Sequence, residues 1–544
     1  MVPALLLGVL PLCYFSARLG LLKRPWLRRS VLAAAVLLAA GSLPYQGVDF
    51  AYLKRLNLFI AAGTALILLS RELGVPWVQD SKRYLRTLAT LAIASVVVYY
   101  NFFAFHGEAT WVHSHDVAHY YLGSKYFREL GYGDLYTGML RAEAELFDNH
   151  FKAIEARDLR SGDLVHIRDL LTASGPVRAA FTPERWAGFK ADVAYFRGVL
   201  GPQYGKLFRD HGFNPTPLWA LLGGSLANLV PAGSGRGIFL LTLIDPLLIA
   251  AAFVAVAWAF GAETMLLGMI SFCVGFGAGF GWTGGAFLRC LWFFGVVGAF
   301  AALAKGRPAA AGVLLALASV LRMFPVFFLA AFVFKAIADL VTTGRIARER
   351  QRMLVAFTVT AALLAGATLP AFGFASWGAF QRNLTCHLET SSPNLVGFTS
   401  VIDRHPRDAM VTASELRELR ERRQRTYRIQ LTSVFVLAVL AVAIASQFVG
   451  EVAAAALGVP LLFFGLNLAS YYYVFLVVLV LASRGQPRRL ALLFTAEAVT
   501  YALMLFEDRD AVLFAYRSVV VLYLLAALAV ERRGPGVSPS ARAT

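Results

Sequence analysis

The sequence predicts an all-α fold, a polytopic transmembrane helix bundle of about 13–16 membrane segments with a large non-cytoplasmic loop that contains amphipathic helices. Three observations predict this class. Hydrophobic residues make up 58% of the 544 residues and charged residues only 15%, against about 45–50% and about 25% in soluble domains. The apolar residues form runs of 14–24 residues, long enough for roughly 30 Å of hydrocarbon. The basic residues behind the net charge of +18 gather between these runs.

Sixteen apolar runs are candidate membrane segments, and several are short enough to be re-entrant or half-helices. In chain order they span 3–22, 30–46, 57–70, 86–105, 217–230, 237–260, 264–281, 286–304, 308–321, 323–340, 353–371, 429–448, 451–468, 470–484, 488–506 and 511–530. Two polar stretches, 106–215 and 372–428, interrupt the series. Because backbone polar groups in hydrocarbon must be satisfied internally, the membrane segments are expected to be helical.

The apolar runs and polar stretches divide the chain into five parts. These are N-terminal transmembrane helices at 1–84, a membrane module at 85–371 that includes the outer loop 106–215, a second outer loop at 372–428, C-terminal transmembrane helices at 429–533 and a disordered cytoplasmic tail at 534–544.

Short loops rich in Lys and Arg indicate the orientation, because such loops stay on the cytoplasmic side of a membrane. They occur near 23–29, 71–86, 335–352 and 484–489. Both polar stretches then lie on the non-cytoplasmic side. Two details depart from this scheme. A full crossing at 217–230 conflicts with the orientation of the later loops, so this run is interpreted as only dipping into the membrane. The basic segment 417–428 lies on the non-cytoplasmic side in this scheme, against the trend for basic segments.

Histidine placement indicates which face carries function. All nine histidines lie in the two polar stretches, together with 14 of the 33 acidic residues in the first stretch alone. They are His106, His113, His115, His119, His150, His166, His211, His387 and His405. Avoidance of hydrocarbon by polar groups explains part of this pattern. A loop of over 100 residues is unusually long for a connector, however, and long loops tend to carry function.

Asp116 follows the outer end of the run 86–105 closely, so it is expected within a turn or two of the membrane surface. A carboxylate there can act as a general base towards an acceptor hydroxyl. The structural alternative is an Asp N-cap for a helix from about Val117 to Leu130. Both interpretations stay open at this point.

A metal site is a further interpretation of the same segment. His113, His115, Asp116 and His119 offer imidazole and carboxylate ligands that suit divalent ions. Their spacing matches no strong zinc signature, and the four cysteines include no CxxC pair. The spacing therefore does not support a metal, and no cofactor is expected.

Arg322 lies between two apolar runs whose far ends carry basic loops, which places it at the outer membrane boundary. An isolated Arg among apolar residues is costly unless it reaches water or a partner. A lipid phosphate is a fitting partner, because guanidinium binds phosphate through paired, charge-assisted hydrogen bonds. A snorkelling Arg at a helix end is the alternative. Arg289 is placed similarly and offers a second cation on the same side.

Several short motifs together resemble the integral-membrane glycosyltransferases of the C-type (GT-C) superfamily. Asp116 in an outward loop after a span is followed by Tyr120-Tyr121 and Glu129-Leu130-Gly131-Tyr132, and Phe213-Asn214-Pro215-Thr216-Pro217-Leu218 resembles the Pro-containing entry to the next membrane segment. Leu321-Arg322-Met323-Phe324-Pro325 resembles the basic-x-x-Pro hinge of the bacterial branch related to polyprenol-phosphate-mannose-dependent mannosyltransferases. The stretch from Trp377 to Asn394-Leu395-Val396-Gly397-Phe398 is similar to that branch's outer loop and Asn-led helix.

This resemblance implies a catalytic function for the module at 85–371. It implies an inverting transfer of a sugar from a polyprenyl-phosphate donor to a glycan, glycolipid or protein acceptor, at the periplasmic or extracellular side of a bacterial inner (plasma) membrane. The partners are then the donor, the acceptor and the lipid bilayer, with no nucleic acid. Asp116 carries over as the catalytic base, Arg322 as a donor-phosphate contact with Arg289 as a second cation. The expected substrate-binding residues are His115, His119, Tyr120, His387 and Asn394. Many members have paired acidic residues near this position, whereas His115 precedes Asp116 here.

Two other functions compete with this interpretation. A transporter or flippase for a lipid-linked or anionic substrate places charges and broken helices in mid-membrane, and Asp245-Pro246 is one candidate for such a feature. A metal-dependent membrane hydrolase built on the outer histidines is the third. The transferred sugar and its acceptor are not determined by the sequence.

Overall fold

The computed structural model is 76% helical with almost no sheet. It describes residues 49–107, 110–173, 175, 177–389, 394–403, 413–507 and 509–531. The predictions for residues 1–48, for His405 and for the tail 534–544 lie outside the described residues.

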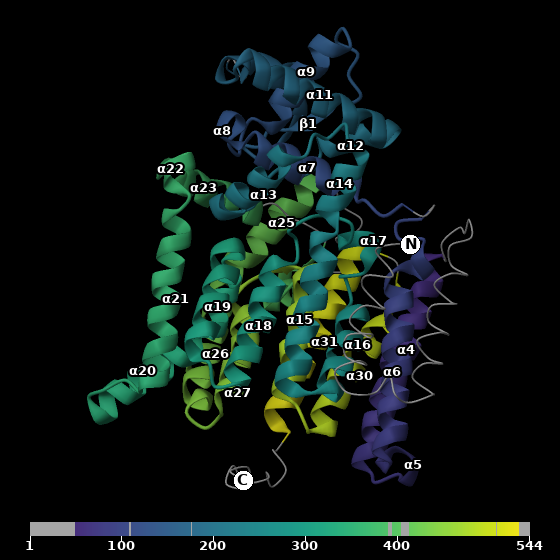
Figure 1. Ribbon diagram of the computed structural model, residues 1–544, viewed down its shortest axis with the longest axis vertical. Coiled ribbons are helices and arrows are strands. Elements are labelled where there is room, and N and C mark those ends of the chain that lie inside the picture. Colours follow the sequence, from purple (N-terminus) through teal and green to yellow (C-terminus); the bar gives the residue numbers. More distant parts are fainter. Residues whose placement is uncertain are drawn as a thin grey trace.

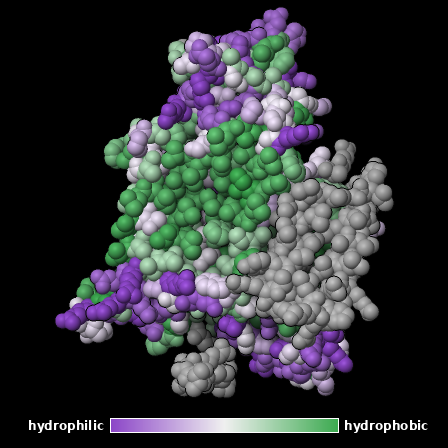
Figure 2. Space-filling model, viewed as in Figure 1, coloured by the Kyte–Doolittle hydropathy of each residue, from purple (hydrophilic) through white to green (hydrophobic). Residues whose placement is uncertain are grey.

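A helical membrane region carries a polar region at one of its ends (Figure 1). Apolar side chains cover a broad band of the visible surface, with polar side chains above and below it (Figure 2). Six segments of the described chain are long and apolar enough to cross a membrane. They are formed by α4 (Phe50–Glu72), α14 with α15 (Gly235–Thr242, Ile244–Phe260), η6 with α20 (Phe324–Leu329, Ala330–Thr343), α21 with α22 (Arg348–Gly366, Leu369–Phe372), α26 (Arg428–Ser446) and α31 (Asp510–Val530).

Five shorter apolar segments accompany these six in the described part of the chain. They comprise α16 (Ala262–Cys273), α18 (Leu291–Ala304), α19 (Pro308–Arg322), α27 with α28 (Glu451–Ala456, Gly458–Gly465) and η8 with α29 (Ser470–Leu476, Val477–Ala482). Helix α6 (Ser81–Tyr99) packs against α16, and α30 (Pro487–Leu503) packs against α4. Two short helices, α5 (Pro76–Gln79) and α17 (Phe280–Thr283), serve as connections. The predicted helical membrane protein is confirmed, whereas the number of about 13–16 segments stays a prediction.

The first polar stretch forms a compact helical region at the end of the membrane region (Figure 1). It contains α7 (Ser114–Lys125), α8 (Phe127–Leu130), α9 (Leu135–Leu146), α10 (Ile167–Ala173), η4 (Val177–Ala180), α11 (Pro183–Leu200), η5 (Gly201–Gln203) and α12 (Tyr204–Leu207). It is preceded by η3 (Asn101–Phe103) and followed by α13 (Pro217–Leu229), which the apolar run 217–230 forms. A short antiparallel pair, β1 (Glu155–Arg157) and β2 (Leu164–His166), joins them with Ala156 opposite Val165.

Buried aromatic side chains hold the polar region together. The ring of Phe189 on α11 lies against the rings of Tyr126, Phe181 and Trp186, with centroid separations of 4.9, 5.3 and 5.5 Å. Pairs in this range contribute about 0.5–1.5 kcal/mol beyond the area they bury. These rings belong to a hydrophobic core that continues into the membrane region.

The second polar stretch lies at the same end of the molecule as the first (Figure 1). It contains α23 (Ala375–Glu389), β3 (Leu395–Val396), α24 (Phe398–Asp403) and α25 (Ala413–Thr426). Strand β3 pairs with β4 (Leu468–Ala469), which directly precedes η8. This pairing fastens the second polar stretch to the end of a membrane segment.

Helix α19 ends at a backbone break that shapes the site. Met323 follows Arg322 with a φ of 56°, which is strained for a residue with a side chain. Pro325 then occupies the start of η6 and has no N–H to continue the hydrogen-bond ladder. The backbone therefore breaks within Leu321-Arg322-Met323-Phe324-Pro325, and Arg322 is the last residue of the helix.

Candidate functional site

Asp116 lies in the first turn of α7, where its carboxylate forms an ion pair with the guanidinium of Arg289. Both side chains are largely buried, with exposed fractions of 18% and 13%. The helix begins at Ser114, before the expected start at Val117, so Asp116 is not its N-cap. After a turn at Tyr126 the chain continues in α8, which ends at Leu130, the expected end of the helical stretch. His113 fills the N-cap position of α7 and its Nδ1 accepts the Asp116 N–H at 3.2 Å. Burial lowers the pKa of His113 to about 3, which leaves the ring neutral and able to accept.

The loop before α18 brings Arg289 to Asp116. Its Gly285 carbonyl accepts the His113 N–H at 3.0 Å. Gly285 has a φ of 69°, and a Cβ there would overlap the Trp111 carbonyl oxygen, so only glycine fits this close approach. The buried carboxylate of Asp245 accepts the N–H groups of Arg289 and Cys290 at 3.0 and 2.8 Å. Asp245, a transporter candidate by sequence, thus fixes the backbone that carries Arg289.

Aromatic rings lie against each of the two cations that the sequence predicts as phosphate contacts. The guanidinium carbon of Arg289 lies 4.7 Å from the ring centre of Tyr471. The corresponding carbon of Arg322 lies 5.8 Å from the ring of Tyr472 and 6.0 Å from that of Tyr120. Cations at such distances are attracted to the faces of aromatic rings. Tyr120 belongs to α7, one turn beyond Asp116, so α7 contacts both arginines.

A cavity of about 970 Å³ opens beside Arg322. Elements from the membrane region and from both polar stretches line it. Its charged lining residues are Arg322, Arg420, Arg425, Arg428, Asp403 and Glu421, and its aromatic ones are Phe324, Phe380, Tyr471 and Tyr472. Glu421 pairs with Arg425 at 3.2 Å. Four guanidinium groups against two carboxylates give the lining a positive excess.

The structure gathers most of the predicted site residues at one end of the molecule. Asp116 contacts Arg289 directly and Arg322 lines the large cavity, with Tyr120 beside it. Asp116 is thus connected to Arg322 through Tyr120 of the same helix, and its carboxylate is paired with Arg289. Asn394 precedes β3, and its carbonyl accepts the Ser470 N–H at 2.8 Å. His387 belongs to α23, but its side chain lies outside the described residues.

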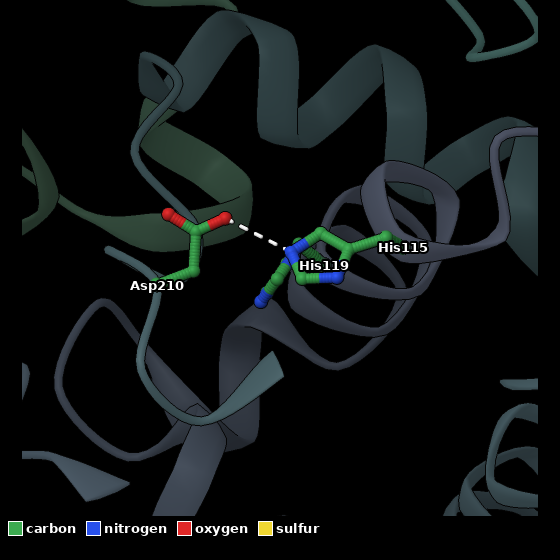
Figure 3. Close-up of side chains that lie close together, drawn as sticks. All are labelled: His115, His119 and Asp210. Atoms are coloured by element: carbon green, nitrogen blue, oxygen red, sulfur yellow. Dashed lines mark hydrogen bonds and ion pairs between the residues drawn. The ribbon is translucent and has the colours of Figure 1, made fainter. Parts of the chain in front are cut away.

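His115 and His119 of α7 form a separate cluster with Asp210, which comes from the loop between α12 and α13 (Figure 3). The Nε2 of His115 is 3.1 Å from Oδ2 of Asp210. Burial lowers the pKa of His119 to about 4. Burial by itself would raise the pKa of Asp210, but the hydrogen bond with His115 and the charge of His119 outweigh it and hold that pKa well below its usual range. At neutral pH the cluster therefore offers a neutral imidazole and an ionised carboxylate.

Sequence reasoning missed several of these residues. Asp210 precedes His211 in the sequence, and this Asp-His pair was the available signal. Tyr471 and Tyr472 belong to a run of three tyrosines inside an apolar segment, an unusual composition for a membrane helix. Glu497 and Arg517 form a buried ion pair between α30 and α31. Each of these two residues is a charged residue within an apolar run, and a charge in such a run indicates that the side chain is paired with a partner.

No family model, no curated protein and no solved structure matches this chain. The fold defines the class: the long apolar helices make it an integral membrane protein. Its polar end carries an Asp–Arg pair, a basic cavity and a His–His–Asp cluster.

Proposed function

We propose that this protein is an inverting membrane glycosyltransferase of the GT-C type, which transfers a sugar from a polyprenyl-phosphate donor to a glycan, glycolipid or protein acceptor. The observation that carries this proposal is the basic cavity beside Arg322, close to the α7 helix that holds Asp116. A volume of about 970 Å³ is at the upper end of the range for small-molecule sites, roughly 300–1,000 Å³.

The lining of the cavity matches the chemistry of such a donor. Guanidinium groups bind phosphate through paired hydrogen bonds, and Arg322 is held in place by the rings of Tyr120 and Tyr472. Aromatic faces such as Tyr472 also suit the apolar faces of a sugar ring. Apolar residues in the lining, including Leu431 and Leu466, suit the first isoprene units of the lipid.

In the proposed reaction an acceptor hydroxyl attacks the anomeric carbon of the donor from the face opposite the phosphate. The new carbon–oxygen bond forms as the bond to the phosphate oxygen breaks, and the leaving polyprenyl phosphate takes the electron pair. Asp116 receives the hydroxyl proton as general base. Arg322 and Arg289 stabilise the charge on the departing phosphate.

The Asp116–Arg289 ion pair gives this reaction an order of events. Without substrate, the Asp116 carboxylate is paired with the Arg289 guanidinium. A donor phosphate competes with that carboxylate for the same guanidinium, and a shift of Arg289 towards the phosphate frees Asp116 to accept a proton. Donor binding thereby activates the base.

Transport of a lipid-linked or anionic substrate is the second candidate function. It is favoured by the buried pair of Glu497 and Arg517 between membrane helices, where Arg517 also donates to Thr500 Oγ1 at 2.9 Å. Ionisable residues inside a membrane region often mark substrate or proton pathways.

A transfer assay separates the two functions. Membranes with the wild-type chain are incubated with a panel of polyprenyl-phosphate sugars, and the transferred residue is identified by mass spectrometry. Transfer of one sugar by wild type and its loss in Asp116→Asn support the glycosyltransferase. No transfer from any donor, combined with donor movement across vesicles that Asp116→Asn leaves unchanged, would establish the transporter. Assays on sealed vesicles of either orientation test the expected location on the periplasmic side of a bacterial inner membrane.

A further inference from the structure

Two histidines of α7 and a carboxylate lie close together in the polar region. His115 and His119 lie four residues apart, which places both on one face of the helix. Asp210 comes from the loop between α12 and α13, 95 residues after His115. One ligand atom from each residue lies within 4.8 Å of the others. Figure 3 shows the three side chains converging from the helix and the loop.

Outer contacts hold His119, the buried member of the cluster, in orientation. Nε2 of His119 is 2.9 Å from the Tyr136 hydroxyl and 3.3 Å from the Leu207 carbonyl. The Gly212 N–H donates to the same hydroxyl at 3.1 Å, which fixes Tyr136 in turn. Metal-binding histidines characteristically donate their second ring N–H to a carbonyl or another oxygen in this way.

The Asp210 loop is fixed just as firmly. Arg157 on β1 donates to the carbonyl oxygens of Arg209 and Asp210, both at 3.2 Å from its Nε. The His211 N–H donates to Oδ1 of Asp210 at 2.8 Å. One carboxylate oxygen is therefore engaged by the backbone, while the other faces His115.

We propose that His115, His119 and Asp210 bind a divalent transition-metal ion, with Zn²⁺ as the best match. In this site Nε2 of His119 keeps its proton and donates to the Leu207 carbonyl, while Nδ1 binds the metal. His115 contributes Nε2 and Asp210 contributes Oδ2. Two imidazole nitrogens and one carboxylate oxygen suit Zn²⁺ and exclude Ca²⁺ and Mg²⁺, which take oxygen ligands.

The distances fit such an ion after small side-chain movements. Zinc ligands at about 2.0–2.2 Å from the metal in tetrahedral geometry are roughly 3.4 Å apart. The 3.1 Å between His115 Nε2 and Asp210 Oδ2 is close to this value. The wider separations, up to 4.8 Å, must shorten. Three protein ligands leave a fourth position for water or for an oxygen of a substrate.

The proposed ion would clamp α7 to the loop that leads into α13. His115 is the neighbour of Asp116, so the clamp fixes the first turn of the helix that carries the ion pair with Arg289. The metal site requires no glycosyltransferase activity, because its evidence lies wholly within the polar region.

Zinc binding to the full-length protein tests the proposal directly. The protein is purified in detergent without a polyhistidine tag, stripped with a chelator that is then removed, and titrated with Zn²⁺ by calorimetry. Wild type is expected to bind one equivalent, and Co²⁺ is expected to give the visible absorption of a nitrogen-ligated tetrahedral ion. His115→Ala and Asp210→Asn should each weaken zinc binding at least 10–100-fold, the range for loss of even an outer contact.

The control is His166→Ala, which removes an exposed histidine of β2 outside the cluster. His115 and Asp210 are 30% and 46% exposed, so their variants should retain the fold, and circular dichroism and gel filtration verify this. Equal zinc affinity in wild type and folded His115→Ala would overturn the proposal, as would a wild type that binds no Zn²⁺. Failure of sugar transfer alone leaves these binding outcomes unaffected, so the two proposals are tested separately.

Discussion

The carboxylate of Asp116 is paired with the guanidinium of Arg289, 173 residues further along the chain. The pair joins the first turn of α7 to the loop before α18, and Gly285 in that loop contacts His113. The ion pair is thus one of the contacts that connect the polar region to the membrane region. Tyr120, one turn along α7 from Asp116, lies against Arg322 at the cavity, so a change at Asp116 is expected to reach the cavity through α7.

Asp116→Asn should lower the rate of sugar transfer about 10²–10⁴-fold, the range for loss of a general base. The amide keeps the size of the carboxylate but cannot take a proton, so donor binding should be retained. Single-turnover kinetics and donor binding to the purified variant measure the two effects. Asp134→Asn is the matched control, because Asp134 pairs with Arg160 in the same region at 2.6 Å, away from the cavity. Wild-type turnover in Asp116→Asn would rule out the base.

A double-mutant cycle on Asp116 and Arg289 should show strong coupling. Arg289→Gln leaves a largely buried carboxylate without its partner and also removes a proposed phosphate contact, so it should weaken donor binding and destabilise the protein. The variant with both Asp116→Asn and Arg289→Gln should be more stable than the sum of the single effects predicts, by about 0.5–3 kcal/mol. Thermal unfolding in detergent measures the coupling. Strict additivity would contradict an ion pair at this position.

Arg322→Ala should weaken binding of a polyprenyl-phosphate donor about 10–150-fold. This corresponds to roughly 1.5–3 kcal/mol for a hydrogen bond to a charged group. Equilibrium binding of a fluorescent donor analogue to the purified protein measures the effect. Arg128→Ala, at an exposed position on α8, removes a cation without touching the cavity and should bind normally. Normal binding by Arg322→Ala would remove Arg322 from the donor site.

Asp192→Ala should destabilise the polar region by about 3–5 kcal/mol, because it leaves a buried Lys without its partner. One carboxylate oxygen of Asp192 accepts from Lys125 Nζ at 2.7 Å and from Tyr126 Oη at 2.8 Å, and the other accepts the Ala232 N–H at 3.3 Å. Proteolysis within 110–230 should become faster, with gel electrophoresis as the measurement. Asp169→Ala, at an exposed position, should leave the rate unchanged. An equal rate in both variants would show that the network is dispensable.

The membrane class and the break after Arg322 could be predicted from residue types. A long apolar run has few alternatives to a membrane helix, and Pro325, which has no backbone N–H, favours a helix end shortly before it. The start of α7 could not be predicted in this way. His113, an unusual cap residue, fills the N-cap position because burial keeps its ring neutral. Only the surrounding tertiary structure supplies that burial.

Hydrophobicity along the chain by itself determined that this protein enters a membrane. It also determined where the polar stretches lie and which residue types are concentrated in them, because solvent preference is a property of each residue. The tertiary structure alone decided the partners. It brought Arg289 rather than Arg322 to Asp116, and it placed Asp210 beside His115 and His119. Such contacts join positions far apart in sequence, so they depend on how helices and loops close on one another, and spacing along the chain carries no record of that closure.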